Sequence, residues 1–134
     1  MAAQPFDWSA YLQLANELAK RQDEASIRSA LSRAYYYVYH LALLRAQANG
    51  FNTVSGEGTH KQLWRNYSAS PEPDCQKLAE IAARLKEKRE RADYQQIYNR
   101  IADDVSGILA DAQDFADRLH RLNIRYPNPN SVRQ

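Results

Sequence analysis

Apolar side chains recur every three to four residues along most of this sequence, the spacing that lines one face of an α-helix. Two long stripes lie in residues 24–49 and 96–122. The first contains Ile27, Leu31, Ala34, Val38, Leu41 and Leu44, and the second contains Ile97, Ile101, Val105, Ile108, Ala112, Phe115, Leu119 and Leu122. Shorter stripes predict three more helices, in residues 9–21, 59–67 and 74–93.

Short polar residues at the starts of these stripes predict where the helices begin, because their side chains accept hydrogen bonds from the first backbone N–H groups. The expected caps are Asp7 or Ser9 for the first helix, Thr59 with Gln62 in a capping box for the third, Asp74 for the fourth, and Asp93 with Gln96 for the fifth. The break near Asp93 contains neither glycine nor proline, so the loss of the apolar phase alone predicts it.

These elements predict an all-α fold, an up-and-down bundle of four long helices plus one short helix. The bundle is expected to form a single domain of residues 1–122. Residues 123–134 contain Pro127, Pro129 and three asparagines, which predicts a C-terminal tail that is ordered only where something holds it.

Charge and cysteine content narrow the classes of function. The net charge of +2 is too small to indicate nucleic-acid binding by bulk charge, so any basic site must be local. Cys75 is the single cysteine, which suits a reducing compartment. No leader pattern and no apolar run of about 20 residues is seen, so we expect a cytoplasmic protein without a membrane partner. No cofactor and no metal site are expected, because zinc-ligand clusters are absent.

The second predicted helix carries an unusual polar set in residues 32–40, where four tyrosines lie between Arg33 and His40. Seven residues make nearly two helical turns, so Arg33 and His40 project from almost the same face. Such a pair suits metal-independent RNA cleavage, in which the histidine moves the 2′-hydroxyl proton and the arginine stabilises the phosphorane. The same pair also suits a structural role, with a packed histidine and a surface arginine, and both interpretations stay open.

Two other segments of the sequence could bind a phosphate. The predicted fourth helix ends in a charged run that includes Arg89 and Arg91, and this run stands just before Asp93 and Tyr94. His60 and Lys61 open the short third helix, whose N-terminus attracts anions. Charged runs are also typical of solvated helix faces, and a first-turn histidine is often structural.

Three segments together resemble the small stand-alone HEPN-domain proteins of bacteria and archaea. Residues 32–42 (SRAYYYVYHLA) resemble the signature S-R-x-Y-Y-A-x-F-H-A, residues 59–61 (THK) resemble its T-H segment, and residues 89–94 (RERADY) resemble its R-x-x-A-D-Y segment. The segments occur in the expected order on the expected helices, and the likeness covers about residues 10–122.

The resemblance implies a helical bundle that forms a homodimer. Many proteins of this family are ribonucleases with an Arg-x(4–6)-His motif, in which residues of two subunits meet in one cleft. Many are toxins or defence proteins, often paired with a nucleotidyltransferase, and others are non-catalytic binding modules. Arg33 and His40 satisfy the motif by count, whereas the toxin branch carries it at the place of residues 89–94, where Asp93 or Ala92 stands instead of histidine.

The first hypothesis is therefore a dimeric protein that binds RNA or a nucleotide, or cleaves RNA as a metal-independent endoribonuclease of a toxin–antitoxin or defence system. Its site residues are His40 and Arg33 for catalysis, Arg89, Arg91, His60 and Lys61 for phosphate, and Tyr36, Asp93 and Tyr94 for the pocket. The second hypothesis is a non-catalytic module that is the partner or substrate of a nucleotidyltransferase, with Tyr94 as the modified residue. The third is a structural adaptor that uses the tyrosines as an interface.

Overall fold

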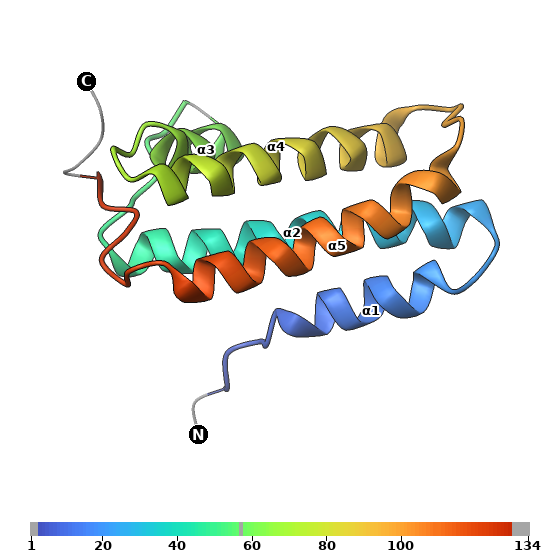
Figure 1. Cartoon of the computed structure of the whole chain (residues 1–134), viewed down its shortest axis with the longest axis horizontal. Helices are drawn as coiled ribbons and strands as arrows, with labels where there is room; N and C mark the ends of the chain where they lie inside the picture. The colour runs from blue at the N-terminus through green and yellow to red at the C-terminus, as the bar shows by residue number, and fades with distance from the viewer. Residues whose placement is uncertain (1–2, 57, 130–134) are drawn as a thin grey trace.

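The computed structural model describes residues 3–56 and 58–129, and within these ranges the regular secondary structure is helical. Five helices follow one another in the chain (Figure 1). They are α1 (Ser9–Ala19), α2 (Glu24–Ala48), α3 (Thr59–Ser68), α4 (Pro73–Tyr94) and α5 (Ile101–Arg121). In Figure 1, α2 and α5 form the middle of the bundle, α4 with α3 covers one side, and α1 covers the other.

The predicted all-α bundle is confirmed, but the predicted count of long helices is wrong. Three helices are long, with 25, 22 and 21 residues, whereas α1 has 11 residues and α3 has 10. The first helix ends at Ala19 and not near Arg21. Asp23 has an extended backbone, with ψ 142°, and its side chain accepts a hydrogen bond from the Ser26 N–H. The chain must therefore leave the helical conformation before this cap.

Helix α2 is the centre of the core, since it packs against each of the other four helices. Tyr35 is fully buried, and Tyr37 and Tyr39 are each 7% exposed. This confirms that a helix with aromatic residues on several faces is buried on several faces. Leu44 departs from the predicted stripe, because it is 52% exposed near the end of α2.

The connection between α4 and α5 differs most from the sequence prediction. Helix α4 continues through Asp93 to Tyr94, and α5 begins at Ile101 after Arg100, which has a left-handed backbone with φ 63°. Asp93 therefore lies in the last turn of α4 and does not cap α5. Ile97, predicted to start the apolar stripe of the fifth helix, lies outside it and is 74% exposed.

Arg28 of α2 explains this connection. Its guanidinium donates hydrogen bonds to the carbonyl oxygens of Ala92 at 2.9 Å, Gln95 at 2.6 Å and Gln96 at 3.2 Å. These carbonyls belong to the end of α4 and the residues after it, where no further helical N–H groups are available. A side chain distant in sequence thus satisfies the C-terminus of α4 and positions its last turn.

Two other predicted caps are also corrected. Gly58 and not Thr59 is the N-cap of α3, without a side-chain cap, and Gln62 bonds the N–H and carbonyl of Val54 instead. Glu72 and not Asp74 is the N-cap of α4, because Pro73 takes the first helical position. For α1, the Asp7 carboxylate does accept a hydrogen bond from the Ser9 N–H, at 3.0 Å.

Part of the predicted tail is held against the bundle. Arg45 of α2 donates to the carbonyl oxygens of Leu119 at 2.8 Å and Tyr126 at 3.2 Å. Asn49 donates to the carbonyl of Ile124, and Pro127 is buried. Residues 123–129 thus pack on the end of α2, whereas the remainder of the predicted tail lies outside the described residues.

We predict that Arg28→Met lowers the free energy of unfolding by about 2 kcal/mol, because it removes hydrogen bonds from a charged donor to helix-end carbonyls. Urea unfolding followed by circular dichroism measures this change. Arg118→Met is the matched control, since Arg118 forms a partly exposed ion pair with Asp114 one turn away on α5, and we expect less than about 0.5 kcal/mol. Equal losses in the two variants would contradict the role given to Arg28.

Candidate functional site

A polar and aromatic cluster forms where α2, α3 and α4 meet. Helix α2 contributes Tyr35, Tyr36 and Tyr39, which lie one turn apart or less along one side of the helix. Helix α3 contributes His60 from its first turn, and α4 contributes Arg89 from its last two turns. We call these five residues the Arg89 cluster.

Arg89 is a buried cation, with an exposed fraction of 7%. Its guanidinium carbon lies 5.1 Å from the centre of the Tyr35 ring and 5.5 Å from that of Tyr36, close enough for cation–π attraction to both rings. The guanidinium forms ion pairs with Asp93 at 3.7 Å and with Glu90 at 3.9 Å. Both distances exceed those of hydrogen bonds.

The guanidinium of Arg89 is therefore short of hydrogen-bond acceptors. Its Nε atom is buried and has no hydrogen-bond partner among the described residues. Asp93 is shared, because its carboxylate also accepts a hydrogen bond from the Ser32 hydroxyl at 3.4 Å. A buried charge normally has close partners, so this arrangement leaves Arg89 with capacity for an additional anion.

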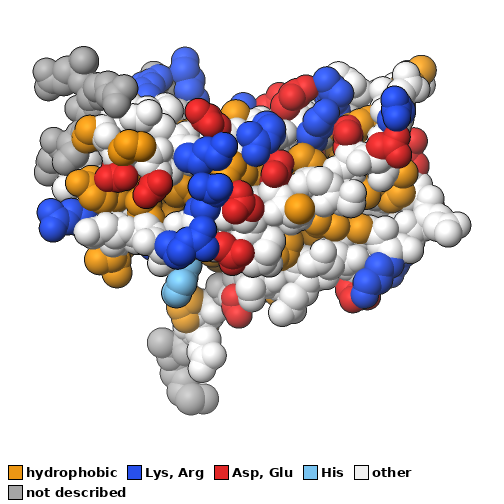
Figure 2. All heavy atoms as spheres, in the orientation of Figure 1, with side chains coloured by type: hydrophobic (Ala, Val, Ile, Leu, Met, Phe, Trp, Pro, Cys, Tyr) orange, Lys and Arg blue, Asp and Glu red, His pale blue; other side chains and the backbone are white. Residues whose placement is uncertain are grey.

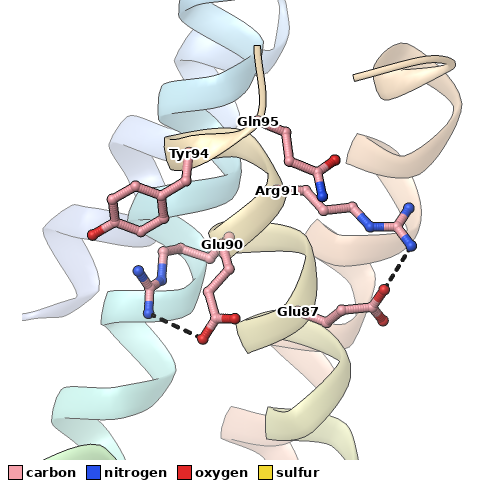
Figure 3. A pocket seen from close by; sticks show the side chains of 6 residues that line it. Glu87, Glu90, Arg91, Tyr94 and Gln95 are labelled. Atoms are coloured by element: carbon pink, nitrogen blue, oxygen red, sulfur yellow. Dashed lines mark ion pairs between the residues drawn. The ribbon is translucent and has the colours of Figure 1, made fainter. Parts of the chain in front are cut away.

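Arg89 also lines an open groove on the surface. The other lining residues are Glu87, Glu90, Arg91, Tyr94 and Gln95, and the volume is about 690 Å³. Tyr94 is 79% exposed at its edge. Figure 3 shows Arg91 turned toward Glu87 and Tyr94 turned to the opposite side of the α4 terminus. We call this hollow the Arg89 groove.

His60 is oriented by a chain of hydrogen bonds. Its Nδ1 atom lies 2.6 Å from the Tyr35 hydroxyl, and the indole N–H of Trp64 donates to the same hydroxyl at 3.0 Å. The phenol of Tyr35 is buried, and its hydrogen has Nδ1 as the neighbouring acceptor. Nδ1 thus accepts, and the neutral imidazole carries its hydrogen on Nε2. Stacking on Tyr39, with ring centres 4.1 Å apart, fixes the ring plane.

Electrostatics also keep His60 neutral. Burial lowers the pKa of its imidazole, and the positive charges of Arg89 and Lys86 lower the same pKa further. The pKa of Tyr35 is raised, mainly by burial, so the phenol keeps its proton. The cluster therefore combines a fixed cation with a neutral imidazole, whose protonation an incoming anion would favour.

Arg33 and His40 share one side of α2, as their spacing predicts, but this side faces α1 and the residues before it. The His40 ring stacks on Trp8 with 3.4 Å between ring centres, and the guanidinium of Arg33 lies 5.0 Å from the Tyr11 ring. In the described part of the chain, no hydrogen bond or ion pair links Arg33 to His40. The catalytic role of the pair stays a prediction.

His40 nevertheless borders the Arg89 cluster. Its ring centre lies 6.5 Å from that of Tyr36, and the ring centre of His60 lies 5.9 Å from that of Tyr36. Burial lowers the pKa of His40 as well. Tyr36, which is half-buried, therefore has two histidines and Arg89 around it.

Arg91 and Lys61 lie farther from this centre. Arg91 forms an ion pair with Glu87 at 2.7 Å and lies 6.0 Å from the Tyr98 ring, toward α5. Lys61 is exposed next to His60. The structure thus brings together Arg89, His60, Tyr36 and Asp93, and it leaves Arg33 and Arg91 with other partners.

Sequence reasoning missed Tyr35 and Tyr39 as members of the Arg89 cluster, and Trp64 as the residue that bonds to Tyr35. The signal for Trp64 was its position four residues after His60, which places both on one face of α3. Tyr35 carried no such signal, because four neighbouring tyrosines are equivalent until the packing of α2 is known.

Other features of the surface restrict the chemistry. Figure 2 shows basic and acidic side chains interleaved on the visible face, in agreement with a local rather than a broad basic site. Within residues 3–56 and 58–129, no group of three or more His, Cys, Asp or Glu side chains is placed to hold a metal ion. None of the helices described is both long and apolar enough to traverse a bilayer.

Comparisons of the chain with protein-family models, with curated proteins and with solved structures found no match.

The lowered pKa values of His40 and His60 predict that the stability of the fold depends on pH. Because the pKa values of His40 and His60 are lowered from 6.5 by folding, the unfolded chain binds more protons just below that pH. Stability is thus fully present above about pH 6.5 and falls as the pH drops toward the folded-state pKa values.

Urea unfolding between about pH 7.5 and pH 5.5 measures this loss, above most carboxylate titration. The variant His40→Gln/His60→Gln is expected to show a flatter pH dependence, while His120→Gln, changed at an exposed position in the last turn of α5, retains the wild-type slope. A wild-type slope in the double variant would contradict the assignment.

Proposed function

We propose that this protein binds the phosphate of RNA or of a nucleotide at the Arg89 cluster, in the manner of a HEPN-like domain. The observation that carries the proposal is Arg89, which is 7% exposed, has no hydrogen-bond partner at Nε among the described residues and lines an open groove. A phosphate would supply the acceptors that its carboxylate neighbours, at 3.7 Å and 3.9 Å, do not.

The surroundings suit the rest of a nucleotide. His60 contacts Tyr35, the same tyrosine whose ring lies under Arg89, so its imidazole is a second donor for a phosphate bound at the cluster. Tyr94, exposed at the edge of the Arg89 groove, provides a flat ring on which the base of an adjacent nucleotide of an RNA strand can stack. Glu87 and Glu90 line the same groove and disfavour a ligand with many closely spaced negative charges.

The same cluster supports metal-independent cleavage of RNA as its chemistry. In this reaction the 2′-oxygen attacks the adjacent phosphorus and loses its proton to a base. The bond to the 5′-oxygen breaks, that oxygen takes up a proton, and a 2′,3′-cyclic phosphate remains. His40 and His60, whose rings both neighbour Tyr36, are the proton-transfer groups, and Arg89 stabilises the phosphorane charge.

The homodimer and the link to a toxin–antitoxin or defence system rest on the resemblance of the three segments to HEPN proteins. In a homodimer, the Arg89 grooves of two subunits would combine into one larger cleft. Cytoplasmic RNA would then be the natural target.

A second candidate is a non-catalytic module that a nucleotidyltransferase partner binds or modifies. The observation that favours it is the phenol of Tyr94, which is 79% exposed in the last turn of α4, where a modifying enzyme could reach it. The assays below separate the two candidates.

We predict that Arg89→Met weakens binding of a fluorescent 5′-phosphorylated single-stranded RNA at least about tenfold, because it removes a buried charged donor. Fluorescence anisotropy at a fixed low salt concentration measures this affinity. Arg91→Met is the matched control on the same helix, and we expect a change below about threefold, since Arg91 is paired with Glu87 and partly exposed.

Thermal unfolding shows whether Arg89→Met remains folded, as the methionine replaces the charge by an apolar side chain of similar length. Equal affinity of the wild type and Arg89→Met would refute the proposed phosphate site.

We predict that the wild type cleaves mixed single-stranded RNA in the presence of a chelator and leaves 2′,3′-cyclic phosphate ends. His40→Gln and His60→Gln are each expected to lose activity at least about 100-fold, because each removes a proton-transfer group. His120→Gln is the control, on the exposed end of α5. Identical background cleavage in all samples would rule out catalysis and leave the second candidate.

A further inference from the structure

A second groove lies between α3 and α4, where Trp64 is one of its lining residues. Its volume is about 560 Å³, within the range of small-molecule sites. Trp64, Ala79 and Ala83 form its apolar part, and Lys61, Arg65 and Lys86 form a basic rim, with Ser68 between them. We call it the Trp64 groove.

The small side chains explain why the groove exists. Ala79 and Ala83 are one turn apart on α4, so neither fills the space beside the indole of α3. The indole itself cannot turn freely, because its N–H donates to the Tyr35 hydroxyl at 3.0 Å. A rigid aromatic face therefore borders an unfilled apolar space.

The Trp64 groove lies next to the Arg89 cluster, because Trp64 and His60 bond to the same Tyr35 hydroxyl. Lys61 follows His60 directly on α3, and Lys86 precedes Arg89 by one turn on α4. Lys86 also forms an ion pair at 3.0 Å with Glu90, which lines the Arg89 groove, so the two grooves are neighbours along α4. A ligand that spans the two sites would thus have a phosphate end at Arg89 and an apolar end at Trp64.

We propose that the Trp64 groove binds the base of the nucleotide whose phosphate is held by Arg89, an inference that rests on the proposed function. A base is flat and largely apolar on its faces, so it suits a fixed indole next to two alanines. The basic rim complements the negative charge that every nucleotide carries next to its sugar. The volume of the groove is sufficient for one base with its ribose.

This arrangement also couples the base to the chemistry. Trp64 and His60 bond to the same Tyr35 oxygen. A base stacked on the Trp64 indole is therefore linked to the His60 imidazole through Tyr35. Binding of the base would hold Trp64 and Tyr35 in place and keep His60 in the tautomer with hydrogen on Nε2. The Trp64 groove would then help the protein to discriminate a nucleotide from a phosphate compound without a base.

The test compares adenosine 5′-monophosphate with ribose 5-phosphate, which has the same phosphate and no base. In a Trp8→Phe background, Trp64 is the sole remaining tryptophan of the two in the sequence, so its fluorescence reports the groove. We expect adenosine 5′-monophosphate to quench this fluorescence and to bind at least about tenfold more tightly than ribose 5-phosphate.

Ala83→Phe is the blocking variant, since Ala83 lines the Trp64 groove and does not line the Arg89 groove. It should abolish the advantage of adenosine 5′-monophosphate and leave the affinity for ribose 5-phosphate unchanged. Ala110→Phe, at an exposed position on α5 outside the groove, is the matched control and should bind as the wild type does.

The outcomes separate this inference from the proposed function. Equal affinity for both ligands, unaffected by Ala83→Phe, overturns the base site alone and leaves the phosphate site. Failure of both ligands to bind the wild type overturns the two together. A further measurement with oligoadenylate shows whether the ligand is RNA or a free nucleotide. If oligoadenylate binds more tightly than adenosine 5′-monophosphate, the ligand is RNA, and if the two affinities are equal, it is a free nucleotide.

Discussion

The constraint on which this structure depends is the burial of a helix that carries polar aromatic side chains on several sides. The tyrosines of α2 cannot all face one neighbour, so the other helices surround it. Burial of Tyr35 imposes a further requirement, because its hydroxyl needs hydrogen-bond partners in the interior. Trp64 and His60 meet that requirement and so determine how the short helix α3 sits on α2.

Arg89 has the same dependence on α2. Its charge is stabilised by the rings of Tyr35 and Tyr36 and by the carboxylates of Asp93 at 3.7 Å and Glu90 at 3.9 Å. These contacts stabilise the buried charge, but they leave the Nε–H donor of the guanidinium without a hydrogen-bond acceptor among the described residues. Residual capacity of this kind is common at binding sites, where the ligand completes the hydrogen bonding. The fold and the candidate site are therefore built from the same residues of α2, and a change in one affects the other.

The C-terminus of α4 shows how a residue distant in sequence, Arg28 of α2, contributes to the candidate site. Arg28 binds the carbonyls at the end of α4, and in the same last turn Asp93 contacts Arg89 and Ser32. Local sequence signals indicated a break near Asp93, because the apolar period stops there. Hydrogen bonds from α2, which lies more than sixty residues earlier, outweigh that local signal.

The sequence by itself determined the helical class, the approximate helix positions and the set of polar residues from which a site could be made, because apolar periodicity and turn residues are local properties. The partners of those residues were decided by the tertiary structure. Spacing placed Arg33 and His40 on one side of α2, but only packing placed that side against α1. From its sequence position, His60 is a histidine in the first turn of a helix. Its contact with Tyr35 and its proximity to Arg89 follow from the packing of α2, α3 and α4.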